Sequence, residues 1–187
     1  MAVDHRSRVP YKKVTSPVLN PLVTRVGQQP DTLRTRPATT GSGPILARLA
    51  NAVPAWKGCQ FKEQAIPGDT SRLKPDLTIL NRSTKEAYII DVTMPFEGPD
   101  SFADARTAKE QKYSHLKTLL RSQGFQKVEV DSFIVGPLGS WDTANESVLR
   151  KVSISRKYAK LFRQLCCSEA IKGSFHIWRN TIPEPDI

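Results

Sequence analysis

Residues 76–93 have the sequence DLTILNRSTKEAYIIDVT, in which the polar segment 81–86 separates two short apolar runs. Runs of this length and β-branched content predict two strands joined as an antiparallel hairpin. A six-residue loop then places Asp76 directly opposite Asp91. Opposed residues in such a pair have Cβ atoms roughly 4.5–5.5 Å apart, so the two carboxylates repel unless a cation lies between them. The hairpin therefore predicts the centre of a sheet and a candidate cation site.

The segments around this hairpin predict the rest of the fold. Further strands are expected at 60–66 and 128–135, and helices at 45–53, 100–122, 142–152 and 156–177. The order α-β-β-β-α-β-α-α predicts an α/β protein whose mixed sheet is flanked by helices. A length of 187 residues suits one such domain.

The first 44 residues differ from the rest in charge and proline content. The chain carries 28 Lys+Arg against 18 Asp+Glu, and residues 1–50 hold eight of the basic residues but two of the acidic ones. Six of the fourteen prolines lie in 1–44, which contains no Phe or Trp. We expect 1–44 to be a disordered basic arm, 45–180 to be the folded domain and 181–187 to be a flexible tail.

The net charge of +10 favours a polyanionic partner, most simply nucleic acid. No stretch approaches eighteen consecutive apolar residues, and residues 1–10 lack the apolar core of a secretory signal. The three cysteines lack metal-ligand spacing, which argues against a zinc module and a disulfide framework. We therefore expect a protein of a reducing, intracellular compartment with no membrane partner.

The helix predicted after the hairpin has one face that begins cationic and ends apolar. The residues on this face are Phe102, Arg106, Lys109, Tyr113, Leu116 and Leu120, with Lys112 beside Lys109. The apolar end should pack on the sheet and leave the cationic end near Asp91 and Glu97. Phosphodiester hydrolysis needs a metal to activate water and a cation to stabilise developing charge, which Lys109 or Lys112 can supply.

Each of these features also has a plainer interpretation. Asp76 can cap a turn after Pro75, Asp91 can accept backbone hydrogen bonds, and the two lysines can belong to a solvated helix face. The combination of opposed acids with a cationic helix favours chemistry over these alternatives. Mg²⁺, or Mn²⁺, is the expected metal because both accept carboxylate and water ligands.

Several separated segments of residues 45–180 resemble one known family. They are Lys74-Pro75-Asp76, Asp91-Val92-Thr93, Pro95-Phe96-Glu97, Lys109-Glu110-Gln111-Lys112-Tyr113 and Leu138-Gly139-Ser140-Trp141. Their order and spacing are similar to the restriction-like endonuclease domain of non-LTR retrotransposon polyproteins, a branch of the PD-(D/E)xK nuclease superfamily. The resemblance implies a restriction-endonuclease-like αβββαβ core with C-terminal helices, and a metal-dependent nick in target DNA that primes reverse transcription.

The resemblance also implies roles for individual residues. The implied catalytic residues are Asp76, Asp91, Lys109, Lys112 and Tyr113, with the two aspartates as metal ligands. Glu63 and Glu97 are implied as accessory ligands. Thr93 stands where the wider superfamily has its lysine, and in the retroelement branch the following helix supplies that function.

Basic residues outside this set favour contact with a DNA backbone. Residues 148–179 carry eight basic residues against one acidic residue. The predicted contacts are Lys74, Arg106, Arg150, Lys151, Arg156, Lys157, Lys160 and Arg163. The alternative is a solvated face of amphipathic helices.

The family polyproteins also contain a reverse transcriptase and a zinc knuckle, and neither is seen here. We therefore expect a detached nuclease module, located in the nucleus, with DNA and element RNA as partners. The main alternative is a catalytically inactive, truncated remnant that binds nucleic acid. A weaker alternative is a basic adaptor protein that uses the sheet only as a scaffold.

Overall fold

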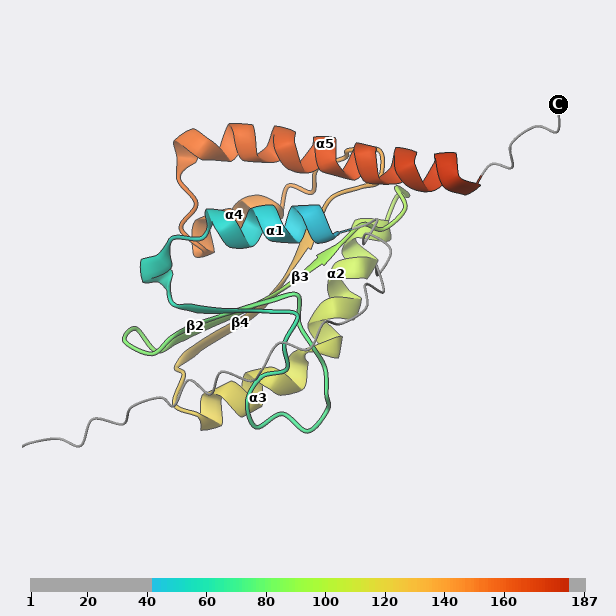
Figure 1. Cartoon of the computed structure of the whole chain (residues 1–187). Coiled ribbons are helices and arrows are strands. Elements are labelled where there is room, and N and C mark those ends of the chain that lie inside the picture. The colour runs from blue at the N-terminus through green and yellow to red at the C-terminus, as the bar shows by residue number, and fades with distance from the viewer. Residues whose placement is uncertain (1–41, 182–187) are drawn as a thin grey trace, which may run out of the picture. The chain divides into compact units, whose positions relative to one another are not determined.

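The hairpin lies inside a four-stranded sheet with helices on both faces, in a computed structural model that describes residues 42–181 (Figure 1). The elements are α1 (Gly43–Ala52), the short 3-10 helix η1 (Ala55–Lys57), β1 (Cys59–Lys62), β2 (Leu77–Asn81), β3 (Glu86–Thr93), α2 (Ser101–Lys112), α3 (Ser114–Ser122), β4 (Lys127–Ile134), α4 (Asn145–Lys151) and α5 (Arg156–Thr181). The predicted mixed α/β architecture is therefore confirmed. The predicted basic arm and tail lie almost entirely outside the described residues.

The sheet has the strand order β1-β2-β3-β4 and mixes both directions of pairing. β1, β2 and β3 pair antiparallel, while β3 and β4 pair parallel through the crossover that contains α2 and α3. In the hairpin Leu80 pairs with Ala87 and Leu77 with Ile90, as predicted. This register brings Asp76 to the level of Asp91.

Side chains of β3 alternate between two apolar layers, one on each face of the sheet. Tyr88 and Ile90 belong to the core with α1, α4 and α5, whereas Ala87 and Ile89 belong to the core with α3. Because β3 is buried on both faces, its sequence is a nearly continuous run of apolar residues. Asp91 continues the row of Ala87 and Ile89, so its carboxylate faces α2 and α3.

The helix predicted at 100–122 is two helices, and this prediction is corrected. The break is at Tyr113, which has φ −102° and ψ 8° and is only 1% exposed. α2 contains no buried residue, whereas α3 buries Leu116 and Leu120. Only the second half has an apolar stripe to hold it on the sheet. The tyrosine turns inward where that stripe begins.

The first strand is shorter than the predicted 60–66. β1 ends at Lys62 because Glu63 adopts the left-handed backbone conformation, with φ 50°, which an extended strand does not accommodate. The Glu63 N–H still donates to the Asp76 carbonyl oxygen at 3.0 Å. The end of β1 is thereby held beside the residue that precedes β2.

α5 packs on the sheet with its first half and leaves its second half exposed. Its buried residues are Ala159, Phe162, Cys166 and Ala170, and residues 171–181 are exposed or half-buried. Within residues 42–181 no helix, α5 included, is long and apolar enough to cross a membrane. The C-terminal half of α5 is therefore available as a surface.

Candidate active site

The two predicted acids lie close together on the face of the sheet that α2 and α3 cover. Asp91 is in β3 and is 3% exposed, while Asp76 directly precedes β2 and is half-buried. The Val92 N–H donates to Asp76 Oδ2 at 2.8 Å. This hydrogen bond fixes the Asp76 carboxylate against the strand that carries Asp91.

Asp91 has two partners, and both come from the helix that the sequence singled out. The Tyr113 O–H donates to Asp91 Oδ1 at 2.7 Å. Lys109 Nζ lies 2.5 Å from Asp91 Oδ2. A buried carboxylate is costly unless it is paired and hydrogen-bonded. The sequence prediction that Asp91, Lys109 and Tyr113 share one site is therefore consistent with the geometry.

The charge of Asp91 acts on Asp76 in spite of these partners. Burial, and then the charge of Asp91, raise the pKa of Asp76, while the Val92 N–H and Lys109 oppose the shift. Burial, followed by the hydrogen bond and charge of Asp91, raises the pKa of Tyr113 well above its ordinary value. Tyr113 therefore remains a protonated donor, and the acid pair retains unrelieved repulsion at neutral pH.

Replacing Asp76 by Asn is expected to raise the free energy of unfolding at pH 7, by less than about 1 kcal/mol because water screens the half-exposed carboxylate. Because folding raises the pKa of Asp76, its ionised form destabilises the fold. This destabilisation is fully present at pH values above the pKa of Asp76 in the folded state. It disappears as the pH falls to the pKa of an aspartate in the unfolded chain, about 3.9. Urea unfolding of wild type and Asp76→Asn should converge between pH 7 and pH 4.

The control for this comparison is Asp104→Asn, which removes an exposed acid from the first turn of α2. That variant should not be stabilised at either pH. An Asp76→Asn variant that is no more stable than wild type at pH 7 would contradict the repulsion between the two acids.

Lys112 and Glu63 occupy the edge of the site. Lys112 Nζ lies 4.7 Å from the centre of the Tyr113 ring, and its side chain is exposed. Its contact is therefore with the tyrosine rather than with an acid. The Glu63 charge contributes to the raised pKa of Asp76, so its exposed carboxylate lies within electrostatic range.

Glu97, implied as an accessory ligand, contacts the loop that follows β4. Its Oε1 accepts hydrogen bonds from the N–H groups of Leu138 at 3.2 Å and Ser140 at 3.3 Å. Gly136 lies so close to the Glu97 side chain that a Cβ there would overlap it. Glu97 thus holds the loop that follows β4.

The acid pair fits Mg²⁺ through its donor chemistry. Within the described residues no group of three or more His, Cys, Asp or Glu side chains could hold a metal. Mg²⁺ does not require such a cage, because it binds through one or two carboxylates and completes its shell with water and phosphate oxygens. Each carboxylate oxygen also keeps a lone pair beyond its present partner. Asp76 and Asp91 would hold the ion, and Mn²⁺ has the same ligand preference.

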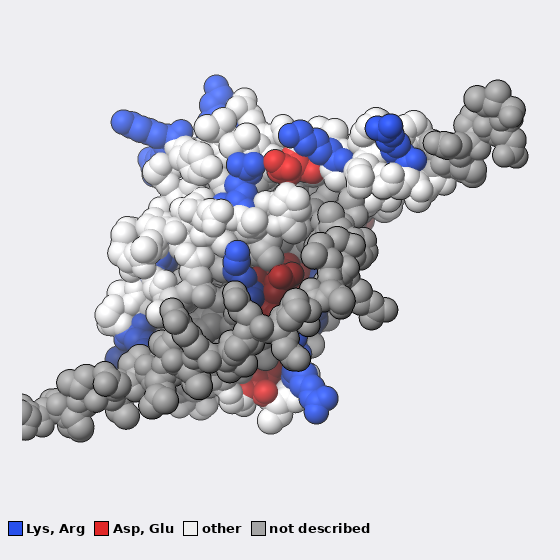
Figure 2. Space-filling view, viewed as in Figure 1, with Lys and Arg blue, Asp and Glu red and all other residues white. Residues whose placement is uncertain are grey.

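The predicted DNA-contacting residues fall into two groups. Three are engaged in ion pairs: Arg106 with Asp142, Lys151 with Glu129 and Asp131, and Arg163 with Glu146. The exposed residues are Lys74, Arg150, Arg156, Lys157 and Lys160. Figure 2 shows Lys and Arg side chains along the upper edge, where α5 runs in Figure 1. The exposed group is the better candidate for phosphate contacts.

Asp142 was not predicted as part of this region. It is 8% exposed and accepts from Arg106, so it holds α2 to the segment before α4. An aspartate that precedes a helix is more often a cap than an ion-pair partner. Asp142 follows the turn that returns Trp141 to pair with Val135, and no local sequence pattern indicates its contact with Arg106.

No protein-family model matches the chain, and no match was found among curated proteins. The assignment of function therefore depends on the chemistry of Asp76, Asp91, Lys109 and Tyr113.

Proposed function

We propose that this protein is a Mg²⁺-dependent or Mn²⁺-dependent DNA endonuclease that nicks one phosphodiester bond, and that its sheet and helices form a restriction-endonuclease-like core. The observation that carries the proposal is the buried Asp91, which lies beside Asp76 and contacts Lys109 and Tyr113. A pair of neighbouring carboxylates, one with a raised pKa, beside a positioned cation is typical of catalytic sites.

Each residue of the site has a distinct task in this proposal. The chemistry that a bound Mg²⁺ would supply is positive charge, which would make a water more acidic and offset negative charge on the phosphate oxygens. Asp76 and Asp91 bind the ion. Tyr113 fixes the rotamer of Asp91 by donating to Oδ1. Lys109 is close enough to Asp91 to orient the nucleophile or to contact a phosphate oxygen.

The proposed context is that of a non-LTR retrotransposon nuclease, whose nick primes reverse transcription. A nuclear location and element RNA as a second partner belong to the same proposal. The exposed basic residues of α4 and α5 would bind the DNA backbone. The same residues also favour the second candidate, an inactive nucleic-acid-binding remnant.

The test is nicking of supercoiled plasmid by the purified chain, in Mg²⁺ and in EDTA. The nuclease proposal expects relaxed circles in Mg²⁺ alone. The alternative of an inactive remnant predicts salt-sensitive DNA binding that does not depend on metal, and no cleavage. Equal nicking by wild type and Asp91→Asn would overturn the site assignment.

Lys109→Met is expected to slow nicking by about 100-fold, because it removes the cation that contacts Asp91. Lys112→Met should stay within about threefold of wild type, since Lys112 lies over the Tyr113 ring. Both substitutions keep the apolar stem, so the packing changes are matched. Single-turnover nicking rates measure the difference, and equal losses in both variants would contradict a special role for Lys109.

A further inference from the structure

An apolar groove lies between the segment that follows β3 and the last turns of α5. Its volume is about 780 Å³, and its walls include Met94, Phe96, Pro137, Leu138, Phe175 and Trp178. Phe96 is 89% exposed and Trp178 is 58% exposed. The groove is therefore an open apolar surface, separate from the acid pair.

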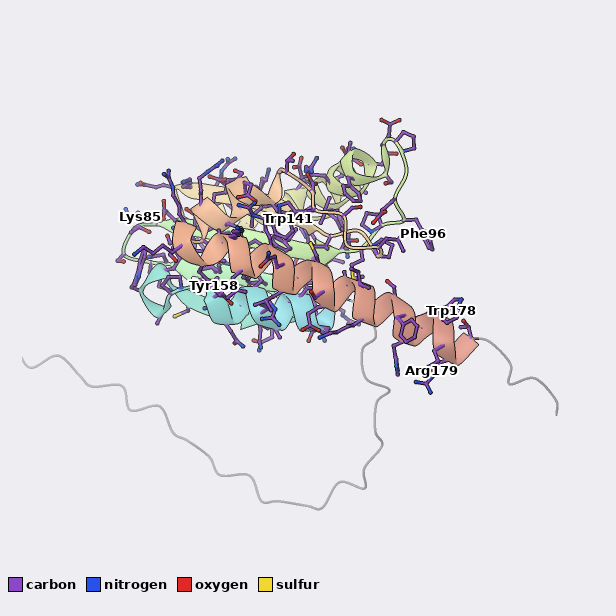
Figure 3. The ribbon with its side chains drawn as sticks, turned by 90° about the horizontal axis from the view of Figure 1, so that it is seen from above. Lys85, Phe96, Trp141, Tyr158, Trp178 and Arg179 are labelled. Atoms are coloured by element: carbon purple, nitrogen blue, oxygen red, sulfur yellow. The ribbon has the colours of Figure 1, made fainter. Side chains whose placement is uncertain are left out.

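Aromatic rings form both walls of the groove. The centres of the Phe175 and Trp178 rings are 5.8 Å apart, with their planes inclined by 33°. Phe96 comes from the opposite wall, and Figure 3 shows it at the same end of the molecule as Trp178. Exposed apolar surface of this kind is typical of interaction surfaces.

The helix that carries two of these rings is otherwise cationic. Its basic residues nearest the rings are Lys172 and Arg179, which are exposed and lie three and four residues from Phe175. The single acid of α5, Glu169, forms an ion pair with Arg48 at 3.0 Å. A second copy of this chain on the same face would bring like charges together, so the face favours a polyanion with flat apolar groups.

We propose that the groove binds the unpaired bases of single-stranded DNA beside the nick, with phosphates on Lys172 and Arg179; this inference rests on the proposed nuclease function. Bases in a duplex are stacked on each other, so exposed rings can only receive unpaired ones. The chain reaches the groove at Met94, three residues after Asp91. Asp91 faces α2 and α3, while α5 covers the other face of the sheet, so a strand from the acid pair reaches the groove around this end of β3.

The experiment measures the affinity of the full chain for oligo(dT) and for a blunt duplex of equal length, in EDTA so that nothing is cleaved. Oligo(dT) should bind more tightly than the duplex and quench tryptophan fluorescence. Trp178→Ala and Phe175→Ala should each weaken oligo(dT) binding about 10-fold and leave duplex binding unchanged. Trp56→Ala is the matched control, because Trp56 is 70% exposed and lies outside the groove.

Three results would overturn the proposal. They are unchanged oligo(dT) binding by both groove variants, tighter binding of oligo(rU) than oligo(dT), and a dimer of the wild type that Trp178→Ala dissociates. A chain that nicks plasmid but shows no groove-dependent binding leaves the nuclease intact and removes this inference. A chain that shows groove-dependent binding but no nicking keeps the single-strand-binding groove and removes the nuclease proposal.

Discussion

Asp91→Asn is expected to slow Mg²⁺-dependent nicking by at least about 1000-fold. The substitution keeps the size of the side chain and an oxygen that can accept from Tyr113. It removes the negative charge that would hold the ion, and charge stabilisation by a catalytic metal is worth several kcal/mol. The rate of conversion of supercoiled to relaxed plasmid measures the loss.

The variant must be compared with a fold control and a charge control. Thermal unfolding should show that Asp91→Asn remains folded, because the site keeps its volume. Asp104→Asn removes one exposed negative charge from α2 and should nick at the wild-type rate. If Asp91→Asn remains folded and nicks within tenfold of wild type, then Asp91 does not hold the metal.

The hairpin was predictable because its two determinants are local. The connection sets the register, although it is 82–85 rather than the predicted 81–86 because Asn81 pairs with Glu86, and the alternation of side chains decides which residues share a face. With Leu80 paired to Ala87, Asp76 and Asp91 must face the same layer. The cationic face of the following helix was equally visible, and Lys109 and Tyr113 do reach Asp91.

The helix break and the role of Glu97 were not predictable, because they depend on contacts between distant segments. Polar residues of the type found in α2 continue a helix as well as any others, so the sequence predicts no end before Gly124. The turn at Tyr113 lets its side chain enter the core. Glu97 binds the N–H groups of a loop some forty residues later in the chain, which a local pattern cannot indicate.

Tyr113→Ala is expected to lower the free energy of unfolding by about 4 kcal/mol. The ring is 1% exposed and packs with Leu116 and Leu120 in the core beside α3. Truncation of a buried aromatic ring leaves a cavity as well as losing its transfer free energy. The loss would also leave Asp91 Oδ1 without the donor that now binds it. Chemical unfolding measures the change.

Tyr113→Phe separates packing from positioning, because it keeps the ring and removes only the O–H. Its loss of stability should be about 1–2 kcal/mol, the cost of leaving one buried oxygen of Asp91 without its hydrogen bond. Nicking should nonetheless slow about 10-fold, since Asp91 would no longer be held in one orientation. A Tyr113→Phe variant that nicks at the wild-type rate would limit Tyr113 to a packing role. If Tyr113→Ala were no less stable than Tyr113→Phe, the ring could not be part of the core that holds α3 on the sheet.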